Sequence, residues 1–413
     1  MKIERKTMNL GKVYFWYLFF VLFLQIIGMD GKSDTLELLW KMAVISCTML
    51  YILYKNSWNV TRYLVFPLII YAGGQILAYM NFPGATSSTF INCVVVIGMA
   101  YMFISLTSGD SGFQLEDMLW FVKAFTALML YAVAYQIITD PNAVSGALTQ
   151  ESVYSDMMSS FFDNKQTFGM FLFVAFIVSF LGLTLTKKKI YIAFALAFFA
   201  MLFVCSSRTS LLACVVFVLI MLVQLFRSNR KLAVSVSLFV GLFVILVWTV
   251  PSLNRFVLEV LLDTEKTVDA RERIWDGAFQ AMRGGKILFG YGEGNVALAI
   301  EGIDEDLIGN AHNGLIHVFV TGGLIKFVLY VCVVINSLRS IRRIYKHNAV
   351  LANVFFAAVV GLIAFSMGES LVFLDTSSPC IVASIVGVAF PIAVDKYYTT
   401  AENRKLESEM RAL

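Results

Sequence analysis

Three side chains in the second half of the chain have the chemistry needed to transfer a group from a phosphorylated donor. Arg208 lies in a short turn between two apolar runs, Arg271 lies in a long polar interval, and His312 directly precedes another apolar run. A guanidinium group offers a forked pair of donors to phosphate oxygens, so two arginines suit a diphosphate. Imidazole is a suitable proton acceptor near neutral pH. The sequence predicts a diphosphate clamp of Arg208 and Arg271, with His312 as the base or the group that orients an acceptor.

Each of these residues also has a purely structural interpretation. Arg271 could pair with a carboxylate such as Asp263, Arg208 could anchor a helix end at the lipid headgroups, and His312 could cap or anchor its helix. The short loops expected on the same side as Arg208 are otherwise almost free of basic residues. This contrast favours the functional interpretation of the two arginines taken together.

The polar interval, residues 250–312, contains a predicted helix. Asp269 is expected to cap its first turn, with Glu272 three residues later in the position of a capping box. A glycine pair at 284–285 is expected to end it.

Helical spacing makes this predicted helix amphipathic, so we expect it to lie flat against the membrane surface or the helix ends. Arg271 lies on the apolar stripe, where a guanidinium must find an anion, whereas Arg273 faces water. The other members of the stripe are Trp275, Ala278, Phe279 and Met282.

Four further polar features carry weaker signals. The glycine-rich stretch 290–294 could present amides to a phosphate, but no strand precedes it and no clear helix follows, so a turn is favoured. The acidic triplet 304–306 resembles a metal-binding loop, although charge runs in loops are usually solvated. His317 follows His312 by five positions and points to a different face. Lys326 lies inside an apolar run without an obvious acidic partner, where it lines a cavity or extends toward the interface.

The elements that must position these residues are membrane-spanning helices. Of the 413 residues, 59% are hydrophobic and 15% are charged, which excludes an ordinary soluble domain. Repeated long apolar runs predict an all-α polytopic membrane protein with about twelve transmembrane helices. The expected spans lie near 13–29, 37–54, 63–80, 88–107, 117–139, 167–186, 189–205, 209–226, 231–249, 313–336, 350–367 and 378–394.

Basic residues predict the orientation of this array. With the N-terminus in the cytoplasm, most lysines and arginines fall in inner loops and tails, and the short outer loops carry only Lys32, Lys165 and Arg208. Both termini are then cytoplasmic, and residues 250–312 form one long extracytoplasmic cap loop. The chain shows no internal repeat, so residues 1–413 are expected to form a single polytopic membrane domain.

The order and spacing of these residues resemble the O-antigen ligase and Wzy polysaccharide polymerase family. The resemblance covers residues 160–330 and rests on Ser207-Arg208, Arg271-x-x-x-Trp275, Gly290-x-Gly292, His312-Asn313 and Gly322-Gly323. The segment 161–169 also resembles a family motif, with Gln166 where the family usually has Asn.

The resemblance implies a bacterial plasma-membrane glycosyltransferase of the GT-C type. Such an enzyme moves a glycan from an undecaprenyl diphosphate carrier to a sugar hydroxyl outside the cytoplasm. Its expected partners are this donor, a glycan acceptor and the bilayer, together with chain-length regulator and flippase proteins, and no nucleic acid. Lys165, Arg273, Trp275 and Asn313 are accessory site candidates. Glu369 is a further candidate on its position alone, because it flanks the last outer loop together with Asp375.

The chemistry of the predicted residues agrees with that activity. A diphosphate leaves as a stabilised anion and needs charge neutralisation, whereas the acceptor hydroxyl needs a base. Two arginines and His312 would suffice, so no metal and no cofactor are expected, and direct displacement would invert the anomeric centre. Capsule or O-antigen polymerase is the preferred interpretation.

Other functions remain open at the level of sequence. A ligase of the same family differs only in its acceptor, and a glycan polymerase of the shape-and-division group has a similar architecture. A lipid-linked oligosaccharide flippase would share the substrate but has less use for His312. A solute transporter fits the number of spans, yet carriers usually concentrate polar groups near the midplane, and here they gather outside.

Overall fold

A computed structural model gives the fold of the chain. The structure describes residues 62–81, 92–97, 113–149, 158–228, 265–301 and 311–412, except positions 163, 374 and 376. Isolated positions 16, 43, 46, 234, 238, 241 and 249 are also described.

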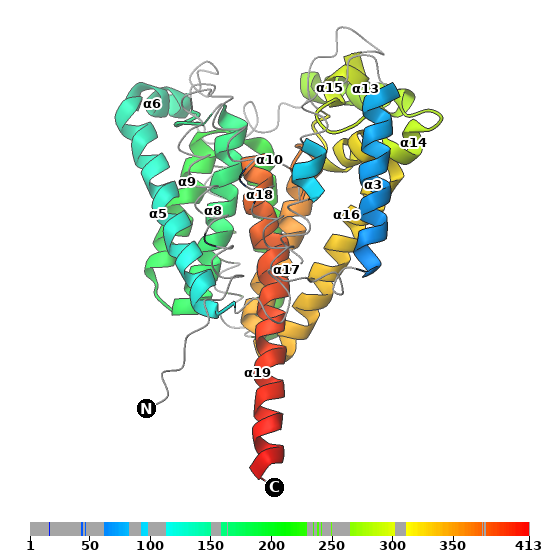
Figure 1. Cartoon of the computed structure of the whole chain (residues 1–413). Helices are drawn as coiled ribbons and strands as arrows, with labels where there is room; N and C mark the ends of the chain where they lie inside the picture. The colour runs from blue at the N-terminus through cyan, green and yellow to red at the C-terminus, as the bar shows by residue number, and fades with distance from the viewer. Residues whose placement is uncertain are drawn as a thin grey trace.

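The elements of the described residues are helices, as predicted. They are α3 (Arg62–Asn81), α5 (Leu115–Thr139), α6 (Pro141–Thr149), α8 (Lys165–Thr186), α9 (Ile190–Val204), α10 (Arg208–Ser228), α13 (Glu265–Ala281), α14 (Lys286–Phe289), α15 (Val296–Glu301), α16 (Gly314–His347), α17 (Ala349–Ser366), α18 (Ser378–Ser384), the π-helical η3 (Ile385–Ala389) and α19 (Phe390–Ala412). Figure 1 shows α13, α14 and α15 gathered at the upper end of the bundle, near α3 and α16, while α19 protrudes from the lower end.

Several of these helices can cross a membrane. Six described segments are long and apolar enough: Leu115–Thr139, Lys165–Thr186, Arg208–Phe226, Gly314–His347, Ala349–Ser366 and Ser378–Glu402. The shorter apolar helix α9 and helix α3 coincide with two more predicted spans. The spans predicted near 13–29, 37–54, 88–107 and 231–249 lie largely outside the described residues. The total of twelve therefore stays a prediction.

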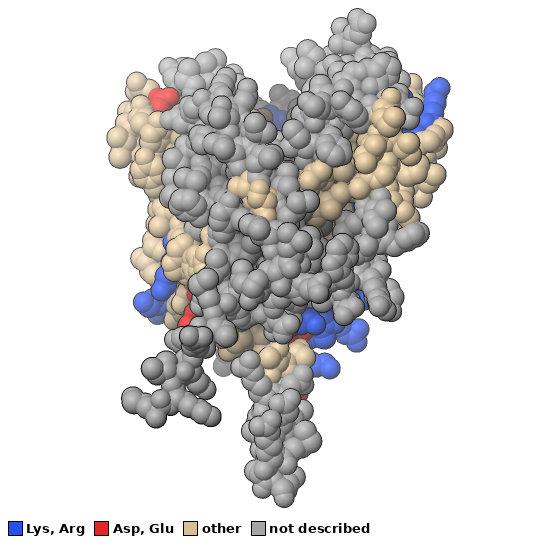
Figure 2. Space-filling view, viewed as in Figure 1, with Lys and Arg blue, Asp and Glu red and all other residues tan. Residues whose placement is uncertain are grey.

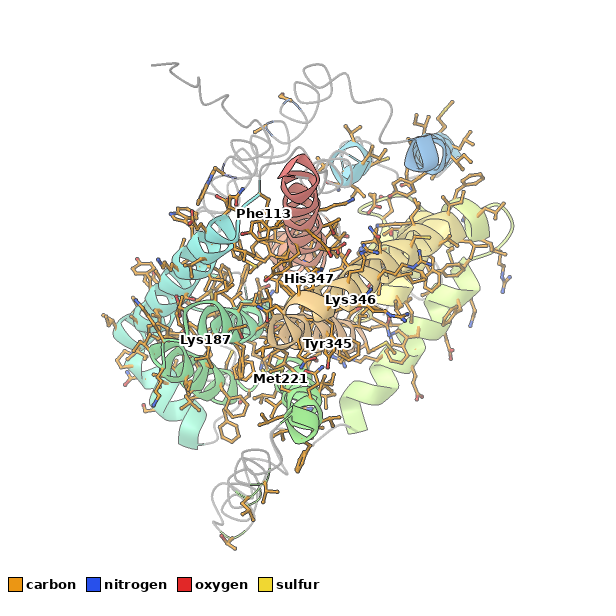
Figure 3. All side chains as sticks on the ribbon, turned by 90° about the horizontal axis from the view of Figure 1, so that it is seen from below. Phe113, Lys187, Met221, Tyr345, Lys346 and His347 are labelled. Atoms are coloured by element: carbon orange, nitrogen blue, oxygen red, sulfur yellow. The ribbon has the colours of Figure 1, made fainter. Side chains whose placement is uncertain are left out.

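Charged residues gather at the ends of the molecule. On the face in Figure 2, most lysine and arginine atoms of the described residues lie near the lower end. Viewed from below, Figure 3 places Lys187, at the end of α8, on the same end as Lys346 and His347, which finish α16. The helices α13–α15 lie at the opposite end (Figure 1). This separation agrees with the predicted sidedness, which itself remains a prediction.

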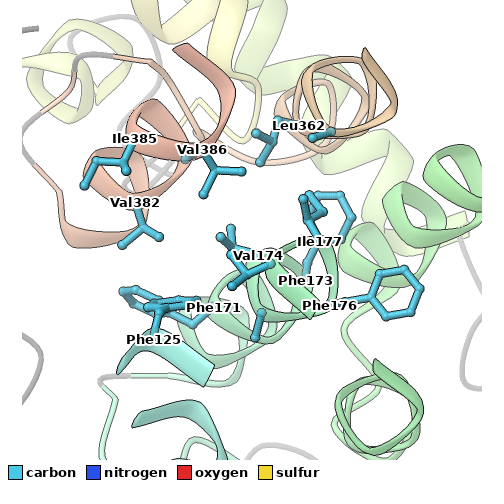
Figure 4. Packing of buried hydrophobic residues seen from close by; sticks show 14 of the residues in the cluster. Phe125, Phe171, Phe173, Val174, Phe176, Ile177, Leu362, Val382, Ile385 and Val386 are labelled. Atoms are coloured by element: carbon cyan, nitrogen blue, oxygen red, sulfur yellow. The ribbon is translucent and has the colours of Figure 1, made fainter. Parts of the chain in front are cut away.

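Phenylalanine side chains form much of the buried core. Figure 4 shows Phe125 of α5 and Phe171 of α8 facing one another, with side chains of α17 and of α18–η3 closing the cluster. Phe173 is fully buried and stacks on Phe365 of α17 with ring centroids 5.8 Å apart. This packing holds α8 against α17, whose end leads to the site described below.

Three of the predicted helices differ in the structure, and the short helices α6, α14 and α15 were not predicted. Helix α19 continues to Ala412, beyond the span predicted to end near 394. Helix α13 begins at Glu265, four residues before Asp269, so the predicted cap at Asp269 is wrong. It ends at Ala281, and Gly284, at φ 59°, follows in the turn. Helix α16 extends beyond the predicted span to His347 and is broken at Gly323, whose φ of 61° and ψ of −160° are not helical.

Candidate active site

One face of α13 points two polar side chains at the same part of the molecule. Arg271 and Trp275 are four residues apart, so they lie on one side of the helix. Arg271 Nη2 lies 3.5 Å from Glu369 Oε1, and Trp275 Nε1 donates to the carbonyl oxygen of Ala311 at 2.9 Å. The predicted stripe is confirmed: Arg271 and Trp275 are half-buried and Ala278 and Met282 are buried, whereas Phe279 is 57% exposed. Helix α13 is thereby tied to the segment that carries His312.

His312 lies in the turn that leads into α16. The next residue, Asn313, is the N-cap: its Oδ1 accepts from the amides of Leu315 at 3.0 Å and Ile316 at 3.2 Å. Asn313 Nδ2 also donates to the carbonyl oxygen of Met367 at 3.2 Å. Asn313 satisfies the free helix amides, so the capping role considered for His312 is filled by its neighbour. His312 itself has a φ of 45°, in the left-handed region.

Glu369 contacts both Arg271 and His312, two of the residues predicted for the site. This buried carboxylate lies 3.3 Å from His312 Nδ1 through Oε2 and 3.5 Å from Arg271 Nη2 through Oε1. An ionised carboxylate can only accept hydrogen bonds, so the contact places the imidazole hydrogen on Nδ1. The lone pair is then on Nε2, where the imidazole can take a proton. His312 is partly open to solvent, with a side-chain exposure of 37%.

Arg208 starts α10 at the same end of the molecule. The next residue, Thr209, lies so close to Gly368 that a side-chain carbon on Gly368 would come within 2.8 Å of its Cγ2. Gly368 directly precedes Glu369. The turn before Arg208 is also packed tightly, because a carbon added at Gly169 would lie 2.4 Å from Ser207 Oγ. The start of α10, which carries the exposed Arg208, therefore lies beside the segment that carries Glu369.

The remaining predicted residues fall into two groups. Trp275, Asn313 and Glu369 contact the His312 segment directly, as described above. Lys165 begins α8, where its carbonyl oxygen accepts from Cys205 Sγ at 3.5 Å, and Arg273 is exposed on α13. Asp263 and the acidic triplet 304–306 lie outside the described residues.

A second polar cluster lies further along α16. Lys326, which has no obvious partner in the sequence, is buried and lies 2.5 Å from Glu293 Oε1. Tyr71 of α3 donates to the same carboxylate oxygen. His317 Nε2 lies 3.3 Å from Asp375 Oδ2, so the two histidines have separate carboxylate partners. Burial raises the pKa of Asp375, but its hydrogen bond from His317 and the charges of His317 and Lys326 outweigh burial, and the net pKa lies below the usual range.

Three residues of this second cluster have donor atoms close enough together to form a metal-like donor set, that is, a group that could hold a metal ion. Ligand atoms of Glu293, His317 and Asp375 lie within 4.8 Å of one another. One imidazole and two carboxylates would suit Zn²⁺ or Mn²⁺ by donor type. The ammonium group of Lys326, however, already lies against Glu293 and supplies positive charge at that position.

The glycine-rich stretch 290–294 is a turn, as predicted, although a short helix that was not expected, α15, begins directly after it at Val296. Gly290, Gly292 and Gly294 all have positive φ, of 71°, 96° and 82°. The amides of this turn are used within the protein: Tyr291 donates to Val320 at 2.8 Å and Gly292 to Thr321 at 3.0 Å. Since these donors are occupied, the structure gives no support to a phosphate cradle at this turn.

Sequence reasoning missed the contribution of α3. Gln75 donates to the carbonyl oxygens of Phe289 at 3.3 Å and Thr321 at 3.2 Å, and accepts from the amide of Glu293 at 3.0 Å. Tyr71 and Gln75 are polar groups inside an apolar helix, which is a signal for a buried partner in a membrane protein. Such a signal could have identified Tyr71 and Gln75 as functional candidates, but it does not reveal that they contact Glu293.

A family model described as O-antigen ligase matches residues 192–331. The match covers less than half of the chain and includes Arg208, Arg271, Trp275 and His312. No match was found among curated proteins. Over this segment the chain is similar to the O-antigen ligase family, and the apolar helices described above indicate a multi-pass membrane protein.

Proposed function

We propose that the protein is a membrane glycosyltransferase that polymerises oligosaccharide units carried on undecaprenyl diphosphate, outside the cytoplasm. The observation that carries this proposal is Glu369, which contacts both Arg271 and His312. The guanidinium group of Arg271, which can bind phosphate, and the imidazole of His312, which can accept a proton, both contact this one carboxylate. A transferase whose donor leaves as a diphosphate and whose acceptor is a hydroxyl needs this combination.

In the proposed reaction, the acceptor hydroxyl oxygen attacks the anomeric carbon of the donor glycan. His312 Nε2 takes the hydroxyl proton while the new C–O bond forms. The bond between the anomeric carbon and the diphosphate oxygen breaks, and the lipid diphosphate leaves with the electron pair. Arg208 and Arg271 stabilise its charge, and attack from the opposite face inverts the anomeric centre. The positive charge comes from arginine, so the proposed reaction uses no metal.

Accessory residues position these groups. Glu369 orients the His312 ring, Asn313 caps the helix behind it, and Trp275 holds α13 against the carbonyl oxygen of Ala311. Lys165 and Arg273 are proposed only as accessory cations for the donor. The acceptor decides between polymerase and ligase: a second lipid-linked glycan in the first case, another cell-surface molecule in the second.

The test uses purified protein and a lipid-diphosphate oligosaccharide. We expect glycan chain growth with the wild type, and losses of about 100-fold or more with His312→Ala and Arg271→Ala. Glu272→Gln, on the exposed side of α13, is the matched control and should retain activity. Chain growth unchanged in both site variants would overturn the assigned roles, and full activity in chelator would support the metal-free reaction.

One observation favours a transporter as the second candidate. Helix α16 is broken at Gly323, close to the buried Lys326, and broken helices with polar groups are typical of carriers. Uptake of a solute or flipping of the lipid-linked oligosaccharide by proteoliposomes, without a glycan product, would favour this second candidate.

A further inference from the structure

The break in α16 leaves backbone groups that other segments satisfy. Beyond Gly323 the helix changes direction, so the carbonyl oxygens of Val320 and Thr321 lose helical partners. They accept instead from the amides of Tyr291 and Gly292. Gly323 and Gly290 allow this approach, because a side-chain carbon on Gly323 would lie 2.3 Å from the Leu288 carbonyl carbon. The turn at 288–293 is therefore seated on the break.

Side chains also hold the turn 288–293 against the break at Gly323, and we call this region the junction. Lys326 Nζ donates to Thr321 Oγ1 at 3.0 Å and lies 2.5 Å from Glu293 Oε1, so it spans the break and reaches the turn. Gln75 bonds both the turn and the carbonyl oxygen of Thr321. Tyr71 donates to Glu293. Three segments distant in sequence thus meet at one buried ion pair.

The half-helix 314–322 connects this junction to the proposed active site. At its start, Asn313 and His312 contact the segment 367–369, and in its middle His317 pairs with Asp375. At its end is the junction. A short rigid helix held at both ends transmits the position of one end to the other.

We infer that the Glu293–Lys326 ion pair is a positioning element for catalysis, which sets the direction of the half-helix and so the place of His312. This inference rests on the proposed function. A buried ion pair contributes little net stability, since desolvation offsets its attraction, but it fixes geometry because each charge must keep its partner. Lys326 supplies a positive charge in contact with Glu293, one of the three residues of the metal-like donor set.

The first test needs no substrate. Hydrogen exchange is measured by mass spectrometry on the wild type, Glu293→Gln, Lys326→Met and Tyr71→Phe, with Arg343→Met as control. Arg343 pairs with Asp395 near the other end of α16, with Nε 2.9 Å from Oδ2. We expect faster exchange in peptides covering 288–294 and 314–323 for the junction variants only. Unchanged exchange there in Glu293→Gln and Lys326→Met would overturn the inference.

The second test separates positioning from folding. We expect kcat to fall about 100-fold in Glu293→Gln and in Lys326→Met, with KM for the lipid donor little changed, as a misplaced base predicts. Tyr71→Phe leaves no charge unpaired and should show a smaller fall, about 10-fold.

The double variant Glu293→Gln/Lys326→Met decides the outcome. It leaves no buried charge unpaired, so its thermal stability should return toward the wild-type value while kcat stays low. A return of kcat together with stability would show a merely structural pair and overturn the inference. Loss of wild-type activity in chelator, restored by Mn²⁺ or Zn²⁺, would also overturn it in favour of a metal site. An exchange response without any glycan product from the wild type would refute the proposed function and leave the junction's positioning of the half-helix supported.

Discussion

At the scale of single residues, His312 combines a proposed chemical role with an unfavourable backbone. A φ of 45° is costly for any residue with a side-chain carbon, and glycine adopts it freely. The surrounding contacts of Ala311, Asn313 and Glu369 hold the residue in this conformation. Strain of this kind is found at functional sites, where the fold stabilises a conformation that the local chain disfavours.

This strain separates the chemical role of His312 from its structural one. His312→Gly and His312→Ala both remove the imidazole, so both should lose glycan transfer. We expect the glycine variant to be more stable than the alanine variant by about 1 kcal/mol, because only glycine relieves the left-handed backbone. Thermal unfolding in detergent measures the difference. Equal stability of the two variants would argue against a strained residue.

Sequence reasoning could name the chemical groups of the site but not all their partners. Arg271 on an apolar stripe predicted that it must find an anion, and the structure supplies Glu369, which lies 98 positions later. No local pattern links two such residues. The partner of Lys326 was likewise not predicted. Glu293 lies in the glycine-rich turn, and the prediction for that turn concerned its glycines but not its carboxylate. Pairing of buried charges is decided by packing.

At the scale of elements, the break at Gly323 is required by close packing. A side chain there would meet the backbone of Leu288 and would also have to adopt positive φ. We expect Gly323→Ala to destabilise the protein by about 2 kcal/mol or more.

Gly73 in α3 provides the matched control for that substitution. Nothing lies within 4 Å of a side-chain carbon added at Gly73, and its φ is not positive. Gly73→Ala should therefore stabilise α3 slightly, by up to about 1 kcal/mol. The two variants are compared by thermal unfolding in the same detergent. Similar stability of both would contradict the packing at the break.

Element boundaries were predicted unevenly, for physical reasons. Long apolar runs identified α5, α8, α10 and α17 well, because hydropathy alone decides them. The start of α13 was predicted too late. The four residues before Asp269 are also helical, so the capping pattern at Asp269 does not mark the start of the helix. The break in α16 at Gly323 was not predicted, because residues 313–336 read as one apolar span. The turn packed against Gly323 explains why the chain breaks there.

At the scale of the whole molecule, the two ends of the bundle differ in charge and in content. Helices α13–α15 and the proposed site occupy one end, and Lys187, Lys346 and His347 the other (Figures 1 and 3). Asp276, exposed on α13, and Lys188, exposed after α8, mark these ends. In a cysteine-free background, we expect Asp276→Cys to react with a membrane-impermeant maleimide in intact cells. Lys188→Cys should react only after permeabilisation, and the reverse pattern would refute the predicted orientation.

Glu369 has a consequence for turnover in the proposed reaction. In the resting molecule this carboxylate is already the counter-ion of Arg271, so an incoming donor must displace an internal competitor before the arginine can hold it. The same competitor reclaims the arginine once the glycan has moved on. In the proposed reaction this competition would favour release of the spent carrier lipid, at the cost of weaker binding of the donor.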